Sequence, residues 1–195
     1  MLDPTDFARS WLVVHTATSF AQHAVPSMGD SVRVNPPPEL LRRRMQHGPH
    51  HLHVSELATH GLTHDHVRRW VRDGWLESLG NGSYLVVTPP TSENPAAWRR
   101  ELARRRVAAT LTALPGAHAR STSAALIHRL PTLHLPHRVE VARRAEIRSR
   151  RDALDCRVAW GPPPEDVGGV FTQRVAETVV EVAACHGAEA GLIVA

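Results

Sequence analysis

Lysine is absent from this chain: all 23 basic residues among its 195 residues are arginines. The absence excludes chemistry that depends on a lysine amine, such as a Schiff-base nucleophile or the lysine of a phosphate-binding P-loop. The codon bias of a GC-rich genome would also replace lysine by arginine throughout. The arginine total therefore does not by itself indicate a function, and the placement of the arginines has to be considered.

Cysteines and long apolar runs are also scarce. Cys156 and Cys185 cannot form a disulfide framework, and no C-x-x-C pair is present to hold zinc. The longest uncharged run, residues 10–29, is interrupted by polar side chains, which argues against a transmembrane helix. Asp3 and Asp6 near the start do not suit a secretory signal peptide. We therefore expect a reduced, cytoplasmic protein without a membrane partner.

Proline-rich stretches predict the division of the chain. Residues 1–37 form an N-terminal extension, either an amphipathic helix or a loosely docked tail. Residues 91–95 have the composition of a linker, which separates a domain at 38–90 from a second domain at 96–195. The second domain ends in an apolar segment without a polar cap, as expected if the chain is truncated there.

Helix and strand signals in both domains predict an α+β protein. In the first domain they predict helices at 39–46, 54–60 and 63–73, and strands at 75–79 and 83–88 joined by the hairpin turn Gly80-Asn81-Gly82. In the second, smaller mixed α/β domain they predict helices at 96–114, 121–130 and 172–185, and strands at 138–143 and 156–160. A basic, hairpin-like loop is expected between these two strands.

The order helix, helix, turn, helix, hairpin is that of a winged helix-turn-helix. Its third helix has an apolar stripe of Val67, Trp70 and Val71 for the core. The remaining positions predict contacts with double-stranded DNA, because such a helix enters the major groove and its hairpin lies beside the phosphates. The predicted DNA-binding residues are Thr63, His64, His66, Arg68, Arg69, Arg72, Asn81 and Ser83, with further phosphate contacts from Arg42, Arg43, Arg44, Arg148, Arg150 and Arg151.

The placement of charge favours the same region. Residues 38–110 hold 11 arginines and seven acidic residues, a balance of +4 that equals the net charge of the whole chain. Because the DNA backbone is polyanionic, a basic region of this kind is typical of a nucleic-acid-binding surface.

A set of ordered motifs carries a specific resemblance. The first is Leu62-Thr63-x-x-x-Val67-Arg68-Arg69-x-Val71-x-x-Gly74-x-Leu76-x-x-Leu79-x-x-Gly82-x-Tyr84-Leu85. It is followed by Ser121-x-Ser123-Ala124-Ala125-Leu126-Ile127-His128-x-Leu130, Arg138-Val139-Glu140-Val141 and Thr178-Val179-Val180-Glu181-Val182-Ala183. Together they resemble the AbiEi-type antitoxins of type IV toxin–antitoxin systems, in the form common in actinobacteria.

This resemblance implies an autorepressor that binds the promoter or operator of its own operon. It also implies that the second domain counters a cognate nucleotidyltransferase toxin without binding it stably. The chain departs from the family pattern at the wing tip, where Gly80-Asn81 replaces basic residues, and at Glu177, where an arginine is expected. Longer relatives continue into an endonuclease-like domain.

Neither a catalytic site, a metal site nor a cofactor is expected, so the chain is not predicted to be an enzyme. The histidines at 47, 50, 51 and 53 have no cysteine or acidic residue nearby at ligand spacing. Ser123 and His128 lack a nucleophile elbow and an orienting acid. Two alternatives to a DNA-binding regulator stay open: a protein-interaction module that acts through its C-terminal half, and a non-catalytic remnant of an endonuclease-like protein.

Overall fold

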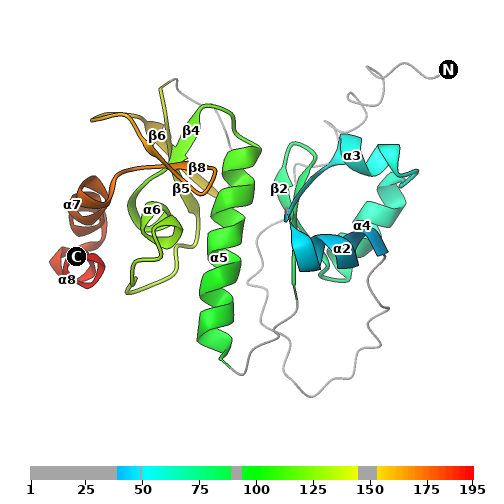
Figure 1. Ribbon diagram of the computed structural model, residues 1–195, viewed down its shortest axis with the longest axis horizontal. Coiled ribbons are helices and arrows are strands. Elements are labelled where there is room, and N and C mark those ends of the chain that lie inside the picture. The colour runs from blue at the N-terminus through cyan, green and yellow to red at the C-terminus, as the bar shows by residue number, and fades with distance from the viewer. Residues whose placement is uncertain (1–38, 49, 89–93, 145–152) are drawn as a thin grey trace. The chain divides into compact units, whose positions relative to one another are not determined.

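A computed structural model describes residues 39–48, 50–88, 94–144 and 153–195, all of which belong to one compact unit. Helices and two separate β-sheets confirm the predicted α+β class (Figure 1). The predicted helix or tail at 1–37 lies outside the described residues. The division into two domains stays a prediction, although the helix after the linker begins earlier than expected, with Asn94 as its N-cap.

The first sheet has three antiparallel strands in the order β1-β3-β2. Its elements along the chain are α2 (Glu39–His47), β1 (His51–His53), α3 (Val54–Thr59), α4 (His64–Arg72), β2 (Leu76–Gly80) and β3 (Ser83–Val86). One apolar side of the sheet packs with the three helices. The buried apolar residues of the sheet and these helices are Leu41, Leu52, Leu57, Val67, Trp70, Leu76, Tyr84, Leu85 and Val86.

Residues with positive φ place the ends of these elements where the sequence predicts them. Gly61 follows α3 with a φ of +69°, and Gly74 follows α4 with a φ of +78°. Asn81 and Gly82 both have positive φ, as a two-residue hairpin turn requires. Helix and hairpin boundaries in this part of the chain are thus determined by local turn chemistry.

Strand β1 is an element that the sequence patterns did not predict. Its three residues pair with β3 as His51↔Leu85, Leu52↔Tyr84 and His53↔Ser83. Leu52 is fully buried between two histidines, so the strand is held by one apolar side chain and its ladder to β3. β3 is therefore the central strand of the sheet, covered along both edges.

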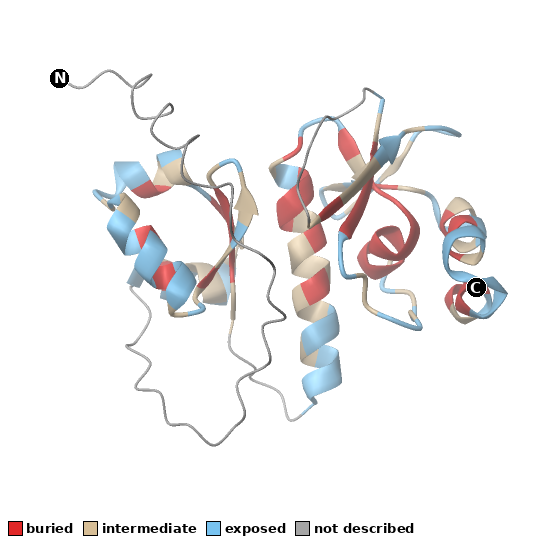
Figure 2. Cartoon of the chain, turned by 180° about the vertical axis from the view of Figure 1, so that it is seen from behind, coloured by how far each residue is buried: buried red, intermediate tan, exposed pale blue. Residues whose placement is uncertain are grey.

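The second sheet is mixed and has the strand order β6-β5-β4-β8-β7. Its elements are α5 (Pro95–Thr112), β4 (Ala117–Ala119), α6 (Ser121–Ile127), β5 (Val139–Arg143), β6 (Leu154–Val158), β7 (Glu165–Val167), β8 (Val170–Thr172), α7 (Val175–His186) and α8 (Ala188–Val194). Every residue of α6 is buried, which makes this helix the centre of the core (Figure 2). Ala103, Val107 and Leu111 of α5 are buried, as is Leu114 just after the end of the helix.

Two predictions for this part of the chain are wrong. β5 and β6 pair in parallel, so the basic segment between them is not the loop of a β-hairpin. The helix predicted at 172–185 begins only at Val175, because Thr172 is fully buried in β8 and Arg174 precedes the helix. The buried positions of α7 are Thr178, Glu181 and Val182. In each case a neighbouring strand or helix decides the structure, and sequence periodicity does not reveal that neighbour.

Helix α5 contacts the first sheet through polar groups. Arg106 donates two hydrogen bonds to Glu77 on β2, at 2.6 and 2.7 Å. Burial disfavours the charge of Arg106, but its pKa is raised because Glu77 accepts these bonds. The indole nitrogen of Trp98 donates to the backbone oxygen of Thr88, and Arg105 donates to the hydroxyl of the same threonine. α5 is thus bonded to the residues that follow the hairpin as well as to β2.

In the part of the chain that the structure describes, none of the helices is both long and apolar enough to cross a membrane.

Candidate nucleic-acid interface

Helix α4 begins with a capping box. The backbone nitrogen of Thr63 donates to Nδ1 of His66 at 3.2 Å, and the Thr63 hydroxyl lies 2.8 Å from the same nitrogen. Reciprocal contacts of this kind satisfy backbone groups that the first helical turn leaves unpaired. The sequence assigned both residues to DNA. The structure gives His66 a structural role at the start of the helix.

The two sides of α4 differ sharply in burial. Val67 and Trp70 are almost fully buried, as predicted, and Figure 2 shows buried and exposed positions alternating along this helix. Val71 is 37% exposed, so its predicted place in the core is wrong. Since α4 has only two positions facing the core, the rest of its circumference is open to a partner.

Three arginines occupy this open side. Arg68, Arg69 and Arg72 are all exposed. Neither Arg68 nor Arg69 forms an ion pair or hydrogen bond with another side chain of the described residues. Arg72 lies 3.6 Å from Asp73, with its side chain 76% exposed. The guanidinium groups are therefore available to an anionic partner, and an arginine fork matches both phosphate oxygens and the O6 and N7 atoms of guanine.

The hairpin turn is held against α3. The backbone nitrogen of Val54 donates to the oxygen of Gly82 at 2.7 Å. A Cβ atom on Gly82 would lie 2.7 Å from a methyl carbon of Val54, so only glycine fits. Asn81 is exposed at the tip, whereas Ser83 is only 3% exposed. The predicted contact of Ser83 with phosphate is therefore wrong, because this residue is buried in the central strand β3.

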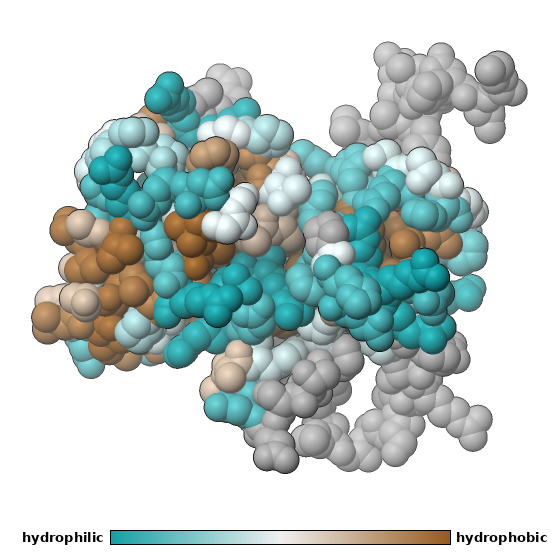
Figure 3. Space-filling model, in the orientation of Figure 1, coloured by the Kyte–Doolittle hydropathy of each residue, from teal (hydrophilic) through white to brown (hydrophobic). Residues whose placement is uncertain are grey.

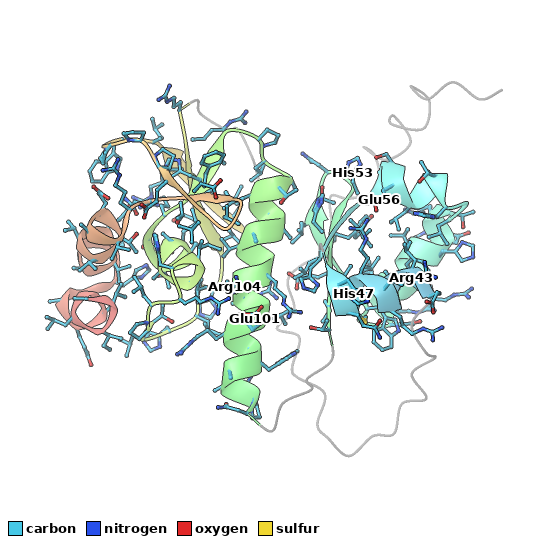
Figure 4. All side chains as sticks on the ribbon, viewed as in Figure 1. Arg43, His47, His53, Glu56, Glu101 and Arg104 are labelled. Carbon is cyan, nitrogen blue, oxygen red and sulfur yellow. The ribbon has the colours of Figure 1, made fainter. Side chains whose placement is uncertain are left out.

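The arginines of α2 fall into two groups. Arg42 and Arg43 are exposed and form ion pairs with Glu39 on the same helix at 3.2 and 3.1 Å. Arg44 pairs with Glu56 of α3, and its side chain is only 20% exposed. The predicted phosphate contact of Arg44 is wrong, because this residue joins two helices. Figure 4 shows Arg43 on α2 and Glu56 near the start of α3.

Four predicted DNA contacts remain, those of His64 and of the arginines at 148, 150 and 151. His64 is half-buried at the start of α4 and takes part in an interaction there. Arg148, Arg150 and Arg151 lie outside the described residues. The open basic surface is therefore defined by Arg68, Arg69 and Arg72, which we call the α4 arginine face; Asn81 is a separate exposed polar residue.

The histidines near β1 have structural positions. Burial, followed by the charge of Arg105, lowers the pKa of His50. Burial likewise lowers the pKa of His51, with a further contribution from His53. His53 is the N-cap of α3, where its Nδ1 accepts a hydrogen bond from the backbone nitrogen of Ser55. Among the described residues no three histidine, cysteine or acidic side chains are grouped so as to hold a metal ion.

Two arginines on α5 strongly lower the pKa of an acidic side chain on the same helix. Hydrogen bonds from Arg104, and then from Arg105, hold the pKa of Glu101 at about 2 despite its partial burial. Figure 4 shows Glu101 and Arg104 next to each other on α5. Both arginines are paired with the carboxylate of Glu101, which distinguishes them from Arg68 and Arg69 of the α4 arginine face.

Comparison with models of known protein families gives no match, and no curated protein is significantly similar to the chain.

Proposed function

We propose that residues 39–86 form a winged helix-turn-helix that binds double-stranded DNA through the α4 arginine face. The order helix, strand, two helices and hairpin supports this proposal, as does the three-stranded sheet in which β1 pairs with β3. The observation that carries it is the exposure of Arg68 and Arg69 without acidic partners on a helix anchored by Val67 and Trp70. α4 is the recognition helix in this proposal.

The chemistry of this face fits DNA better than a neutral partner. Three guanidinium groups lie within a five-residue segment of one helix, whose start is fixed by the Thr63–His66 capping box. Bidentate contacts with guanine or with phosphate need side chains projecting from a rigid element. The hairpin contributes less than a long wing would, because its turn is bonded to Val54 and only Asn81 is exposed there.

The test is a titration of the full chain with a fluorescent duplex that carries the sequence upstream of its own gene. Arg68→Ala or Arg72→Ala is expected to weaken binding by about 1–3 kcal/mol if the side chain reads a base. Affinity should also fall steeply with salt, because each phosphate contact releases counterions. Arg174→Ala is the matched control, since it removes an exposed arginine that directly precedes α7, outside the proposed DNA-binding region. Unchanged binding in both α4 variants would reject α4 as the recognition helix.

We further propose that the protein is a cytoplasmic, autorepressing antitoxin of the AbiEi type. This rests on the resemblance of the sequence motifs. The observed helix α6, strand β5 and helix α7 occupy the three later motifs; α6 and β5 share one hydrophobic cluster, and α6 and α7 share a second. In this proposal the C-terminal half counters a nucleotidyltransferase toxin, and double-stranded operator DNA is the partner of the N-terminal half.

Co-expression with a nucleotidyltransferase encoded beside the gene tests the antitoxin proposal. The full chain should restore growth, and the double variant Arg68→Ala/Arg69→Ala should still do so while losing operator binding. Rescue by the double variant would show that toxin neutralisation does not depend on Arg68 and Arg69. If the full chain fails to restore growth, the antitoxin proposal is refuted while the DNA-binding proposal is unaffected.

A further inference from the structure

A cavity of about 420 Å³ opens beside the second sheet, and the proposed DNA-binding function does not use it. Residues 132–138 form one wall, β5 and β6 supply the floor, and α7 and α8 supply the apolar side with Val182, Ala190 and Val194. Its volume lies in the range of small-molecule sites, which combine an apolar lining with a few convergent polar groups.

Two carboxylates lie next to each other on the floor. Glu140 of β5 pairs in register with Asp155 of β6, and the two strands are parallel. Residues paired in this way project from the same face of a sheet. Both residues line the cavity. Asp155 already has cationic neighbours, with Arg120 at 3.9 Å and Arg157 at 3.7 Å.

Glu140 differs from Asp155 because no arginine side chain of the described residues is bonded to its carboxylate. It is only 7% exposed. One carboxylate oxygen accepts a hydrogen bond from the backbone nitrogen of Ser123 at 3.2 Å, and the other lies 3.0 Å from Nε2 of His186. A buried carboxylate is costly unless it is paired. Among the described residues the basic partner of this carboxylate is His186 alone, whose side chain is 41% exposed.

The wall formed by residues 132–138 also contains an unpaired polar atom. The hydroxyl of Thr132 is buried and makes no hydrogen bond with the described residues. Buried hydroxyls are normally bonded, so this atom is an exception within the wall. The ionisable groups of the wall are His134, His137 and Arg138, and all three are exposed.

We propose that this cavity binds an alkylguanidinium or alkylammonium group. The cationic nitrogens pair with Glu140, with Asp155 beside it. The alkyl chain lies against Val182, Ala190 and Val194. His186 turns toward solvent as the cation replaces it, which its exposed position allows. Such a cation can come from a free small molecule or from an arginine side chain of a protein.

Calorimetric titration of the full chain at low salt tests the proposal with two matched probes. Butylguanidinium is the cation, and butylurea is its uncharged counterpart of nearly the same shape. We expect saturable binding of butylguanidinium and none of butylurea, because the carboxylates recognise charge. A blocked Gly-Arg-Gly peptide distinguishes the sources: its binding assigns the site to a protein side chain, and binding of butylguanidinium alone assigns it to a free molecule.

Variants identify the cavity as the place of binding. Glu140→Gln keeps the shape and should weaken binding by about tenfold or more. Glu165→Gln is the control, because Glu165 lies on β7 beside His128 and does not line the cavity. If Glu140→Gln does not fold, Asp155→Asn decides, with an expected weakening of about threefold or more. No binding up to about 10 mM, equal binding of butylurea, or unchanged binding in the deciding variant overturns the proposal.

Discussion

The buried ion pair between Arg120 and Glu181 allows a quantitative test of what holds the C-terminal half together. Arg120 precedes α6, Glu181 lies on α7, and both side chains are only 5% exposed. Burial disfavours the arginine charge, but its pKa is raised because Glu181 accepts its hydrogen bonds. Glu181→Ala would leave the guanidinium buried without this partner.

The expected loss can be worked out from the contacts. Removing one member of a buried ion pair typically costs 3–5 kcal/mol, because the remaining charge is uncompensated. Asp155 lies 3.9 Å from Nη1 of Arg120 and offers partial compensation. We therefore expect the free energy of unfolding to fall by about 3 kcal/mol, the lower end of that range.

Urea denaturation followed by circular dichroism measures this loss. The double variant Arg120→Met/Glu181→Leu should recover most of it, because apolar side chains of similar volume remove both charges together. Arg157→Ala is the control; it breaks an exposed contact with Asp155 and should cost less than about 0.5 kcal/mol. A loss below about 1 kcal/mol in Glu181→Ala, or a double variant no more stable than that single variant, would refute the reasoning.

Two further predictions concern the first sheet and the histidines. Gly82→Ala should lower the free energy of unfolding more than Gly74→Ala does. Both glycines have positive φ, but only at position 82 would the new Cβ lie against Val54. We expect losses of about 2 and 1 kcal/mol in urea denaturation, and equal losses would contradict the contact. The pKa values of His50, His51 and His118 are lowered below 6.5, chiefly by burial. The unfolded chain therefore takes up protons first as the pH falls through 6.5, so stability should be full above that pH and decline below it. Urea midpoints at pH 7.5 and about 5.5 should differ in this direction, and substituting His50 and His51 by glutamine should reduce the difference; an unchanged pH dependence would count against these two histidines.

Local signals were sufficient for much of the first half of the chain. Thr63, the spacing of Val67 and Trp70, and Gly74 together locate α4 to within a residue at either end. Asn81-Gly82 locates the hairpin turn. These features depend on residues close together in sequence, which is why a pattern can reveal them.

The errors arise where distant residues decide. Ser83 directly follows the hairpin turn, yet it is buried in β3, and β1, whose pairing makes β3 the central strand, is too short to give a periodic signal. Arg44 belongs to a run of three arginines, yet only the packing of α2 on α3 shows that it pairs with Glu56. The cavity also depends on the pairing of β5 with β6 and on the position of α7, which no local pattern specifies.

Apolar side chains remain exposed on the last two helices of the chain. Val180 and Leu192 are 65% and 79% exposed on α7 and α8, where Figure 3 shows a hydrophobic area. Their exposure adds nothing to the core, which on this side is formed by Ala125, Val182, Ala190 and Val194. Polar substitution of these two positions is compatible with the fold.

The bidentate contact between Arg106 and Glu77 has a practical consequence for dissecting the protein. A fragment that stops in the proline-rich segment after residue 88 would keep Glu77 but lose Arg106, together with the bonds that Trp98 and Arg105 make to Thr88. The smallest N-terminal fragment that preserves these interactions ends after Thr112, at the close of α5. The boundary visible in the composition of the chain and the boundary that leaves its bonds intact are thus more than twenty residues apart.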